Sequence, residues 1–190
     1  MKGLITLSGG ITGLLMIAVG TLTPSAIIHP DLSLAPRILS LPSTWQVPAL
    51  LICTLVCGWR AGVIASTAYI SIGLFQLPIF YGGGYFNYIY SPSFGFLIGF
   101  IPASLFTVKL LNTFKDRNIT NLTLSALAGV LTIQLCGTLN LLTGLISSRW
   151  NESFQDLIIN YSLAPLLAQI LICPAVGLIS LYFRRILIIE

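Results

Sequence analysis

Long apolar runs alternate with short polar connections along the whole chain. A membrane-spanning helix needs about 20 apolar residues, and the runs predict six spans. The run from Val47 to Leu77 is divided in two because Gly58-Trp59-Arg60-Ala61-Gly62 is typical of a turn at the membrane interface. The predicted spans cover about residues 4–28, 47–58, 62–77, 93–111, 122–146 and 163–182. The pattern therefore predicts an all-α integral membrane protein, with residues 1–190 forming one domain of six transmembrane helices.

The polar connections predict loops of different kinds. Residues 29–46 contain three prolines and two charges, which favours a loop with a short interfacial helix around residues 34–41. His29, the only histidine, is expected at a helix end rather than in a metal or catalytic site. Residues 147–160 form the other long polar loop.

Composition supports the membrane assignment and excludes a nucleic-acid-binding surface. The chain is 56% hydrophobic and 7% charged, whereas soluble domains carry about 25% charged residues. Its nine Lys and Arg residues lie singly or in pairs between apolar runs, so they act as topology signals and lipid is the surrounding partner. With both termini in the cytoplasm, seven of them lie inside and only Arg37 and Arg149 lie outside, which supports that orientation in a prokaryotic plasma membrane.

The stretch from Gln76 to Phe100 has no charged residue, yet it is too irregular for one helix. Two prolines and the run Gly82-Gly83-Gly84 interrupt it, and tyrosines keep it amphipathic. Irregular backbone at membrane depth must be surrounded by protein or water. This outward-facing stretch is therefore the first candidate for a ligand site, and an aromatic belt at the interface is the alternative.

The remaining motifs exclude several kinds of chemistry. No carboxylate lies within the spans, no nucleotide-binding glycine loop is present, and no credible nucleophile or base is found. We therefore predict that the protein is not an enzyme and that it has neither a metal site nor a bound cofactor. We also predict that it does not power transport by itself. The four cysteines lie in apolar runs and are expected to be buried thiols. Gln134 and Asn140 are six residues apart, so on a helix they cannot face one pocket, and either is as well explained by an interhelical hydrogen bond.

An ordered set of motifs resembles the BioY family of biotin transporters. The runs are PSTWQ (42–46), GWRAG (58–62), Tyr69 with Gly73, LPIF followed by GGG (77–84), and SPSFGFLIGF (91–100). Members of that family are substrate-binding S components of energy-coupling factor (ECF) transporters. The resemblance implies a six-helix protein that captures biotin from outside, together with a coupling transmembrane subunit and ATPase subunits.

The resemblance also implies roles for individual residues. Gly9 and Gly13, which form a small-residue face on the first span, would be the docking face for the coupling subunit, and internal packing is the alternative. The substrate-binding residues implied are Gln46, Tyr69, Gly82, Gly83, Gly84, Tyr85, Asn87, Ser91 and Ser93. Among these we expect Gln46→Ala and Asn87→Ala to weaken binding more than Gln134→Ala.

The chain departs from the family pattern where its last span begins. Residues 161–169 contain no Asp or Lys, whereas the family carries a charged motif there. The carboxylate of biotin would then need a positive charge from Arg149 or Arg37. Two alternatives stay open: an S component for another small vitamin or heterocycle, and a membrane assembly subunit without a ligand.

Overall fold

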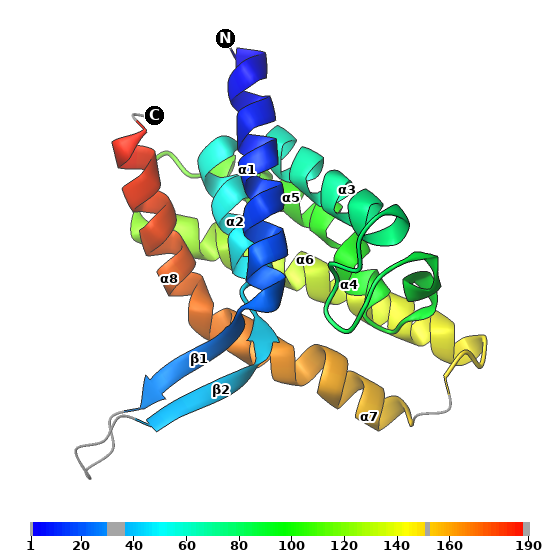
Figure 1. Cartoon of the computed structure of the whole chain (residues 1–190). Helices are drawn as coiled ribbons and strands as arrows, with labels where there is room; N and C mark the ends of the chain where they lie inside the picture. The colour runs from blue at the N-terminus through cyan, green and yellow to red at the C-terminus, as the bar shows by residue number, and fades with distance from the viewer. Residues whose placement is uncertain (1, 30–36, 151–152, 188–190) are drawn as a thin grey trace.

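The computed structural model describes residues 2–29, 37–150 and 153–187, and helices dominate it (Figure 1). Besides the α-helices there is one hairpin of two strands, a 3₁₀ helix (η1) and a π-helix (η2). In chain order the elements are α1 (Lys2–Leu22), β1 (Pro24–His29), β2 (Arg37–Thr44), α2 (Gln46–Cys57), α3 (Trp59–Phe75), η1 (Phe86–Tyr90), α4 (Phe94–Ile98), α5 (Phe100–Thr113), α6 (Ile119–Ile146), α7 (Phe154–Ile158), η2 (Ile159–Leu163) and α8 (Ala164–Ile186).

The helices follow the predicted spans closely. Within the described residues, three helical stretches are long and apolar enough to cross a membrane: Gly3–Leu22, Ile119–Ile146 and Phe154–Ile186. The predicted division of the run at residues 58–62 is confirmed, because Gly58 adopts a φ of 89° between α2 and α3, a conformation that favours glycine. The break is shorter than predicted, since residues 59–62 already belong to α3. The fourth span consists of α4 and α5, which meet at Gly99.

Two predicted boundaries are wrong at the end of the first span. Helix α1 ends at Leu22, not near Ile28, since Pro24 disfavours helical backbone before it. Residues 37–41, expected in an interfacial helix, lie in β2, where Ile27 pairs with Leu39 and His29 with Arg37; residues 34–36 of that helix lie outside the described residues. His29 therefore ends a strand rather than a helix. The hairpin extends outward from the base of α1 and α2 (Figure 1).

The second correction concerns the last polar connection. Residues 154–160, expected in a loop, are helical, because Ser153 caps α7 by accepting a hydrogen bond from the Asp156 backbone N–H. The helix then passes through η2 into α8, so the last span is longer than predicted.

Helix α2 lies at the centre of the bundle. All of its residues except Cys57 are buried, and α1, α3, α5 and α8 pack around it. Gly9 and Gly13 lie on the side of α1 that faces it: a methyl group at Gly9 would approach Cys57 Cβ to 2.8 Å, and one at Gly13 would collide with Cys53 Sγ. These two glycines thus allow close packing inside the chain, and their role in docking a partner stays a prediction.

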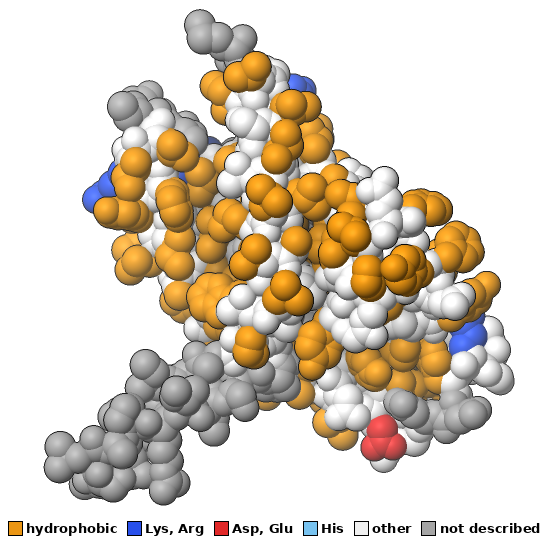
Figure 2. Space-filling model, viewed as in Figure 1, with side chains coloured by type: hydrophobic (Ala, Val, Ile, Leu, Met, Phe, Trp, Pro, Cys, Tyr) orange, Lys and Arg blue, Asp and Glu red, His pale blue; other side chains and the backbone are white. Residues whose placement is uncertain are grey.

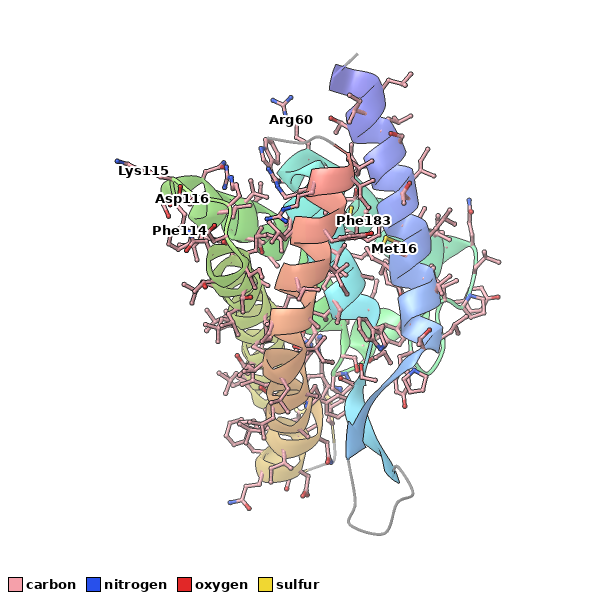
Figure 3. All side chains as sticks on the ribbon, turned by 90° about the vertical axis from the view of Figure 1, so that its left-hand side faces the viewer. Met16, Arg60, Phe114, Lys115, Asp116 and Phe183 are labelled. Carbon is pink, nitrogen blue, oxygen red and sulfur yellow. The ribbon has the colours of Figure 1, made fainter. Side chains whose placement is uncertain are left out.

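Charged side chains gather at the ends of the bundle. Both chain termini lie at one end (Figure 1), and Arg60, Lys115 and Asp116 lie at that same end (Figure 3). The face shown in Figure 2 is covered by apolar side chains between the ends, and on α1 the side chains of Ile11, Leu15 and Val19 are more than half exposed. This distribution is that of a multi-pass membrane protein whose apolar flanks face lipid.

Arg184 fixes the end of α2 against α8. Its guanidinium is buried and donates a hydrogen bond to the Leu55 carbonyl at 2.8 Å, within the last turn of α2. We expect Arg184→Met to lower the free energy of unfolding by about 1–2 kcal/mol, because a charged donor to a helix C-terminus is lost. Thermal unfolding in detergent measures this. The neighbouring Arg185 is exposed, so Arg185→Met is the matched control, and an equal effect of the two changes would contradict the assignment.

Candidate functional site

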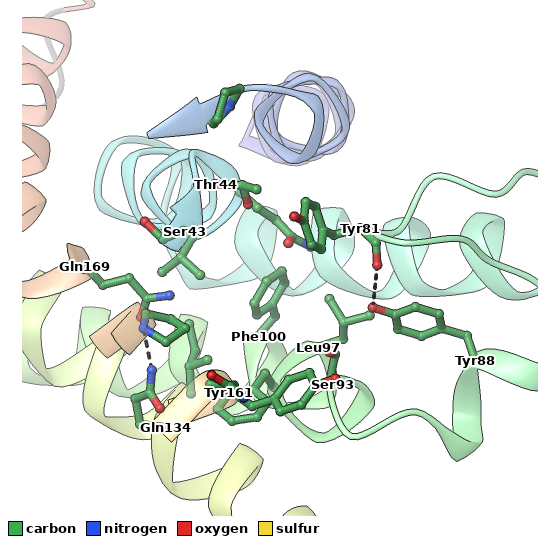
Figure 4. Close-up of a pocket in the computed structure, with 17 residues that line it drawn as sticks. Ser43, Thr44, Tyr81, Tyr88, Ser93, Leu97, Phe100, Gln134, Tyr161 and Gln169 are labelled. Atoms are coloured by element: carbon green, nitrogen blue, oxygen red, sulfur yellow. Dashed lines mark hydrogen bonds between the residues drawn. The ribbon is translucent and has the colours of Figure 1, made fainter. Parts of the chain in front are cut away.

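A cavity of about 380 Å³ lies where the hairpin joins the helices (Figure 4), at the end of the bundle opposite the start of α1 and the end of α8 (Figure 1). Its volume falls within the range of small-molecule sites, about 300–1,000 Å³. The wall comes from the base of the hairpin, the start of α2, the 77–93 connection, α4 and α5, α6, and the region around η2. It is lined by Pro24, Ser43, Thr44, Gln46, Val47, Tyr81, Tyr88, Ser93, Phe96, Leu97, Phe100, Ile133, Gln134, Asn160, Tyr161, Pro165 and Gln169.

The lining combines aromatic rings with uncharged polar groups. None of the lining residues is Asp, Glu, Lys, Arg or His. Rings come from three phenols and from Phe96 and Phe100, and side-chain amides come from Gln46, Gln134, Asn160 and Gln169. Such a wall suits a small, largely apolar molecule that carries a few hydrogen-bonding groups.

Gln46 has a free hydrogen-bond donor in this wall. It is the first residue of α2 and is only 8% exposed, yet its Nε2 has no hydrogen-bond partner among the residues that the structure describes. The position is fixed by α1, because the Trp45 N–H donates to the Thr23 carbonyl at 3.0 Å and Gly20 packs directly against the Trp45 backbone. A buried donor without a partner costs free energy, so this amide is available for a ligand.

Three buried polar side chains form hydrogen bonds that join η2, α6 and α8 on the opposite wall of the cavity. Ser162 Oγ, in η2, donates to Gln134 Oε1 on α6 at 3.0 Å. Gln134 Nε2 in turn donates to Gln169 Oε1 on α8 at 3.3 Å, as Figure 4 shows. The interhelical hydrogen bond considered for Gln134 is therefore present, and the same side chain also lines the cavity.

Tyrosines of the 77–93 connection close one side of the cavity. The Tyr88 hydroxyl donates to the Tyr81 carbonyl at 3.0 Å (Figure 4), and the Tyr88 ring lies 4.7 Å from that of Phe80, centroid to centroid. Burial raises the pKa of the Tyr88 phenol above its ordinary value, so this group stays a neutral O–H donor at physiological pH. Both tyrosines are thereby held beside the cavity.

Tyr69 supports this connection from beneath and does not line the cavity. It is fully buried in α3, its hydroxyl donates to the Ile79 carbonyl at 3.0 Å, and it lies 2.9 Å from the Thr21 hydroxyl of α1. Its ring packs edge-on against Phe80 with centroids 5.4 Å apart. Tyr69 thus fixes the position of the irregular stretch on α1 and α3.

The glycine run and its neighbours lie outside the lining. Gly82 and Gly83 adopt positive φ values of 84° and 142°, which form the turn, and Gly84 packs tightly against Pro78. Tyr85 donates its N–H to the Gly73 carbonyl at 2.8 Å, and both Tyr85 and Asn87 have exposed side chains. In this arrangement these residues shape the connection and do not contact the cavity.

The serine turn before α4 is closer to the site. Ser93 lines the cavity, and its N–H donates to Ser91 Oγ at 3.1 Å, so Ser91 shapes the turn from outside the lining. Asn140 Nδ2 donates to the Pro92 carbonyl at 3.2 Å, which fastens the turn to α6. Gln134 and Asn140 therefore point to different places, as their spacing predicts.

Arg149 lies beside Tyr90 and not in the cavity wall. Its guanidinium carbon is 5.9 Å from the centroid of the Tyr90 ring, and the neighbouring Trp150 Nε1 donates to the Tyr90 carbonyl at 3.0 Å. The side chain of Arg37, the other candidate for a counter-charge, lies outside the part of the chain that the structure describes.

Of the binding residues expected from the sequence, the structure brings only Gln46 and Ser93 into the cavity wall. The sequence prediction gave less weight to Gln134 and did not include Thr44, Asn160 and Tyr161. Uncharged polar residues next to or inside apolar spans are the feature that they share. The geometry also favours Gln134 over the exposed Asn87 as a contact for a ligand.

The fold and the cavity define a small multi-pass helical membrane protein with a neutral, solute-sized site at one end. The BioY family model matches residues 6–188, so the chain belongs to the BioY family. A "Probable biotin transporter BioY" of Lysinibacillus sphaericus is 41% identical over 64 residues, about a third of each chain. An "Uncharacterized 21.2 kDa protein in psbX-ycf33 intergenic region" of Cyanophora paradoxa is 29% identical over 145 residues, which cover 76% of this chain and 74% of that protein.

Among solved structures, the S-component for biotin from an ECF-type ABC transporter matches with a TM-score of 0.67 at 19% identity. The match covers 100% of this chain and 94% of the other. The chain therefore has the S-component fold.

Proposed function

We propose that the chain is the S component of a biotin uptake system in a prokaryotic cell membrane. The observation that carries the proposal is the unpartnered Gln46 amide in a neutral, aromatic cavity. Membership of the BioY family supports biotin as the ligand. The fused rings of biotin suit the aromatic wall, and its ureido group suits the amides.

Uptake against a gradient needs a source of energy, and the sequence offers none of its own. We infer that a coupling transmembrane subunit and ATPase subunits supply it. With the termini in the cytoplasm, the cavity faces outward and biotin enters from outside. None of the described residues that line the cavity is charged, so the biotin carboxylate stays near the mouth, in water or close to Arg149.

The test is equilibrium binding of radiolabelled biotin to the purified chain in detergent. We expect saturable binding with a Kd below 1 µM, about −8 kcal/mol. The absence of saturable biotin binding in this range would refute the assignment. Competition by unlabelled biotin, and by a panel of unrelated vitamins, controls for adsorption to detergent.

A second candidate function is uptake of a different small, neutral heterocycle. The observation that favours it is the absence of charge among the lining residues, since biotin carries a carboxylate at neutral pH. In the competition panel, a neutral vitamin that displaces the radiolabel better than biotin does would support this candidate. A ligand-free assembly subunit fits less well, because the buried Gln46 donor would then never be paired with a ligand.

A further inference from the structure

The π-turn η2 places Ser162 between the cavity and α6. The hydrogen bonds of a π-helix span one residue more than those of an α-helix, and such turns often occur at functional sites. Here the two residues before Ser162, Asn160 and Tyr161, line the cavity, while Ser162 itself is 5% exposed and points to Gln134. The turn thus places Asn160 and Tyr161 in the cavity wall and directs the Ser162 hydroxyl toward Gln134 on α6.

The hydrogen bonds among Ser162, Gln134 and Gln169 run in one direction. The hydroxyl donates to the Gln134 oxygen, and the Gln134 nitrogen donates to the Gln169 oxygen. All three side chains are at least nine-tenths buried. Gln169 Oε1 accepts from Gln134, so the Nε2 end of the same amide is the donor that Gln169 brings to the cavity it lines.

Only one other arrangement keeps both hydrogen bonds. If Gln134 turned its amide over, Gln169 would have to turn as well, and it would then present its oxygen to the cavity. Ser162 would become an acceptor, and its proton would need a new partner. As a donor, the Ser162 hydroxyl therefore selects which end of the Gln169 amide faces the ligand.

We propose that Ser162 and Gln134 are positioning residues that make the cavity wall a hydrogen-bond donor, through Gln169 Nε2 on one side and Gln46 Nε2 on the other. The ligand group recognised is then an uncharged carbonyl acceptor, such as the oxygen of a cyclic urea. This inference rests on the proposed function, in which that oxygen belongs to the ureido ring of biotin.

The discriminating probe is 2-iminobiotin, in which a protonated guanidine replaces the urea. It has the shape of biotin, but it offers N–H donors where biotin offers the carbonyl oxygen. A wall that presents donors leaves its groups unpaired against this analogue, so we expect the wild-type chain to bind biotin at least about 100-fold more tightly.

Gln169→Glu should weaken this preference. One carboxylate oxygen would still accept from Gln134 Nε2, and the other would face the ligand as an anionic acceptor. We expect the ratio of the two Kd values to shift toward 2-iminobiotin by at least about tenfold. The control is Gln155→Glu, which adds the same charge at an exposed position of α7 and should leave the ratio unchanged.

Ser162→Ala tests the positioning role. We expect it to weaken biotin binding about three- to tenfold with little change for 2-iminobiotin, since the two amides are then free to turn over. If the Ser162→Ala and Gln169→Glu variants both bind biotin and both leave the ratio of the two Kd values unchanged, the inference is overturned and the proposed function stands.

The hydrogen-bonded series is also testable without a ligand. Thermal unfolding of Ser162→Ala, Gln169→Met and the double variant forms a mutant cycle. We expect the loss of Tm in the double variant to fall short of the sum of the single losses by about 2 °C or more. Additive losses would refute the series even if the wild-type chain binds biotin, and absence of biotin binding would refute the proposed function alone.

Discussion

Gln46→Ala is expected to weaken biotin binding about 10- to 100-fold, a loss of about 1.4–2.7 kcal/mol. The reason is that Gln46 Nε2 is a buried donor, already stripped of water and without a protein partner, so a hydrogen bond to a ligand recovers its full strength. For the same reason the substitution removes no hydrogen bond between Gln46 Nε2 and the described residues. We expect Tm without ligand to stay within about 2 °C of that of the wild-type chain.

The combination of lost affinity and kept stability separates a ligand contact from a structural residue. Gln76→Ala is the matched control, since Gln76 is exposed at the end of α3 and does not line the cavity. Titration with radiolabelled biotin and thermal unfolding measure the two quantities. A large fall in Tm with unchanged affinity would assign Gln46 to the fold instead.

Gly73→Ala is expected to destabilise the chain by about 1–3 kcal/mol and to weaken biotin binding together with it. Gly73 is buried in α3, and a methyl group there would collide with the ring of Phe80. That ring is only 4% exposed and is packed between Tyr69 and Tyr88, so it cannot move without moving the tyrosines beside the cavity. Stability and affinity are therefore linked at this position.

Gly3→Ala serves as the control for this change. Gly3 lies in α1 with no atom within 4 Å of an added methyl group, and alanine in a helix is favoured over glycine by about 0.5–1 kcal/mol. We expect unchanged or slightly higher Tm and unchanged affinity. If Gly73→Ala behaved like Gly3→Ala, the close packing of Phe80 on α3 would be contradicted.

The helical part of the fold follows from local sequence, and the hairpin does not. Apolar runs define the spans, and Gly58 supplies the break between α2 and α3, so composition alone is enough for these. The hairpin depends on pairing between residues as distant as Pro24 and Thr44, which no local pattern reveals. The π-turn at Ile159–Leu163 contains neither glycine nor proline, so nothing in its own sequence indicates it.

From the sequence, a residue could be assigned to the cavity wall only where its type and its position at the start of a helix were sufficient. Gln46 and Ser93 are polar residues at the start of helices on the outer side, and they do line the cavity. Tyr85 and Asn87 share that composition, but the turn at Gly82 and Gly83 directs them outward. Gln134 and Gln169 meet because α6 and α8 have particular rotations about their axes, which periodicity does not give.

The burial of α2 also bears on how the chain enters the membrane. With 12 residues, α2 is about 18 Å long, well short of the roughly 30 Å of hydrocarbon that an independent span must cross. It is synthesised after α1 but before α5 and α8, which later shelter it. We therefore expect α2 to be inserted as a hairpin with α3, against the small-residue side of α1, so that the biogenesis of the binding site begins with three helices rather than with one.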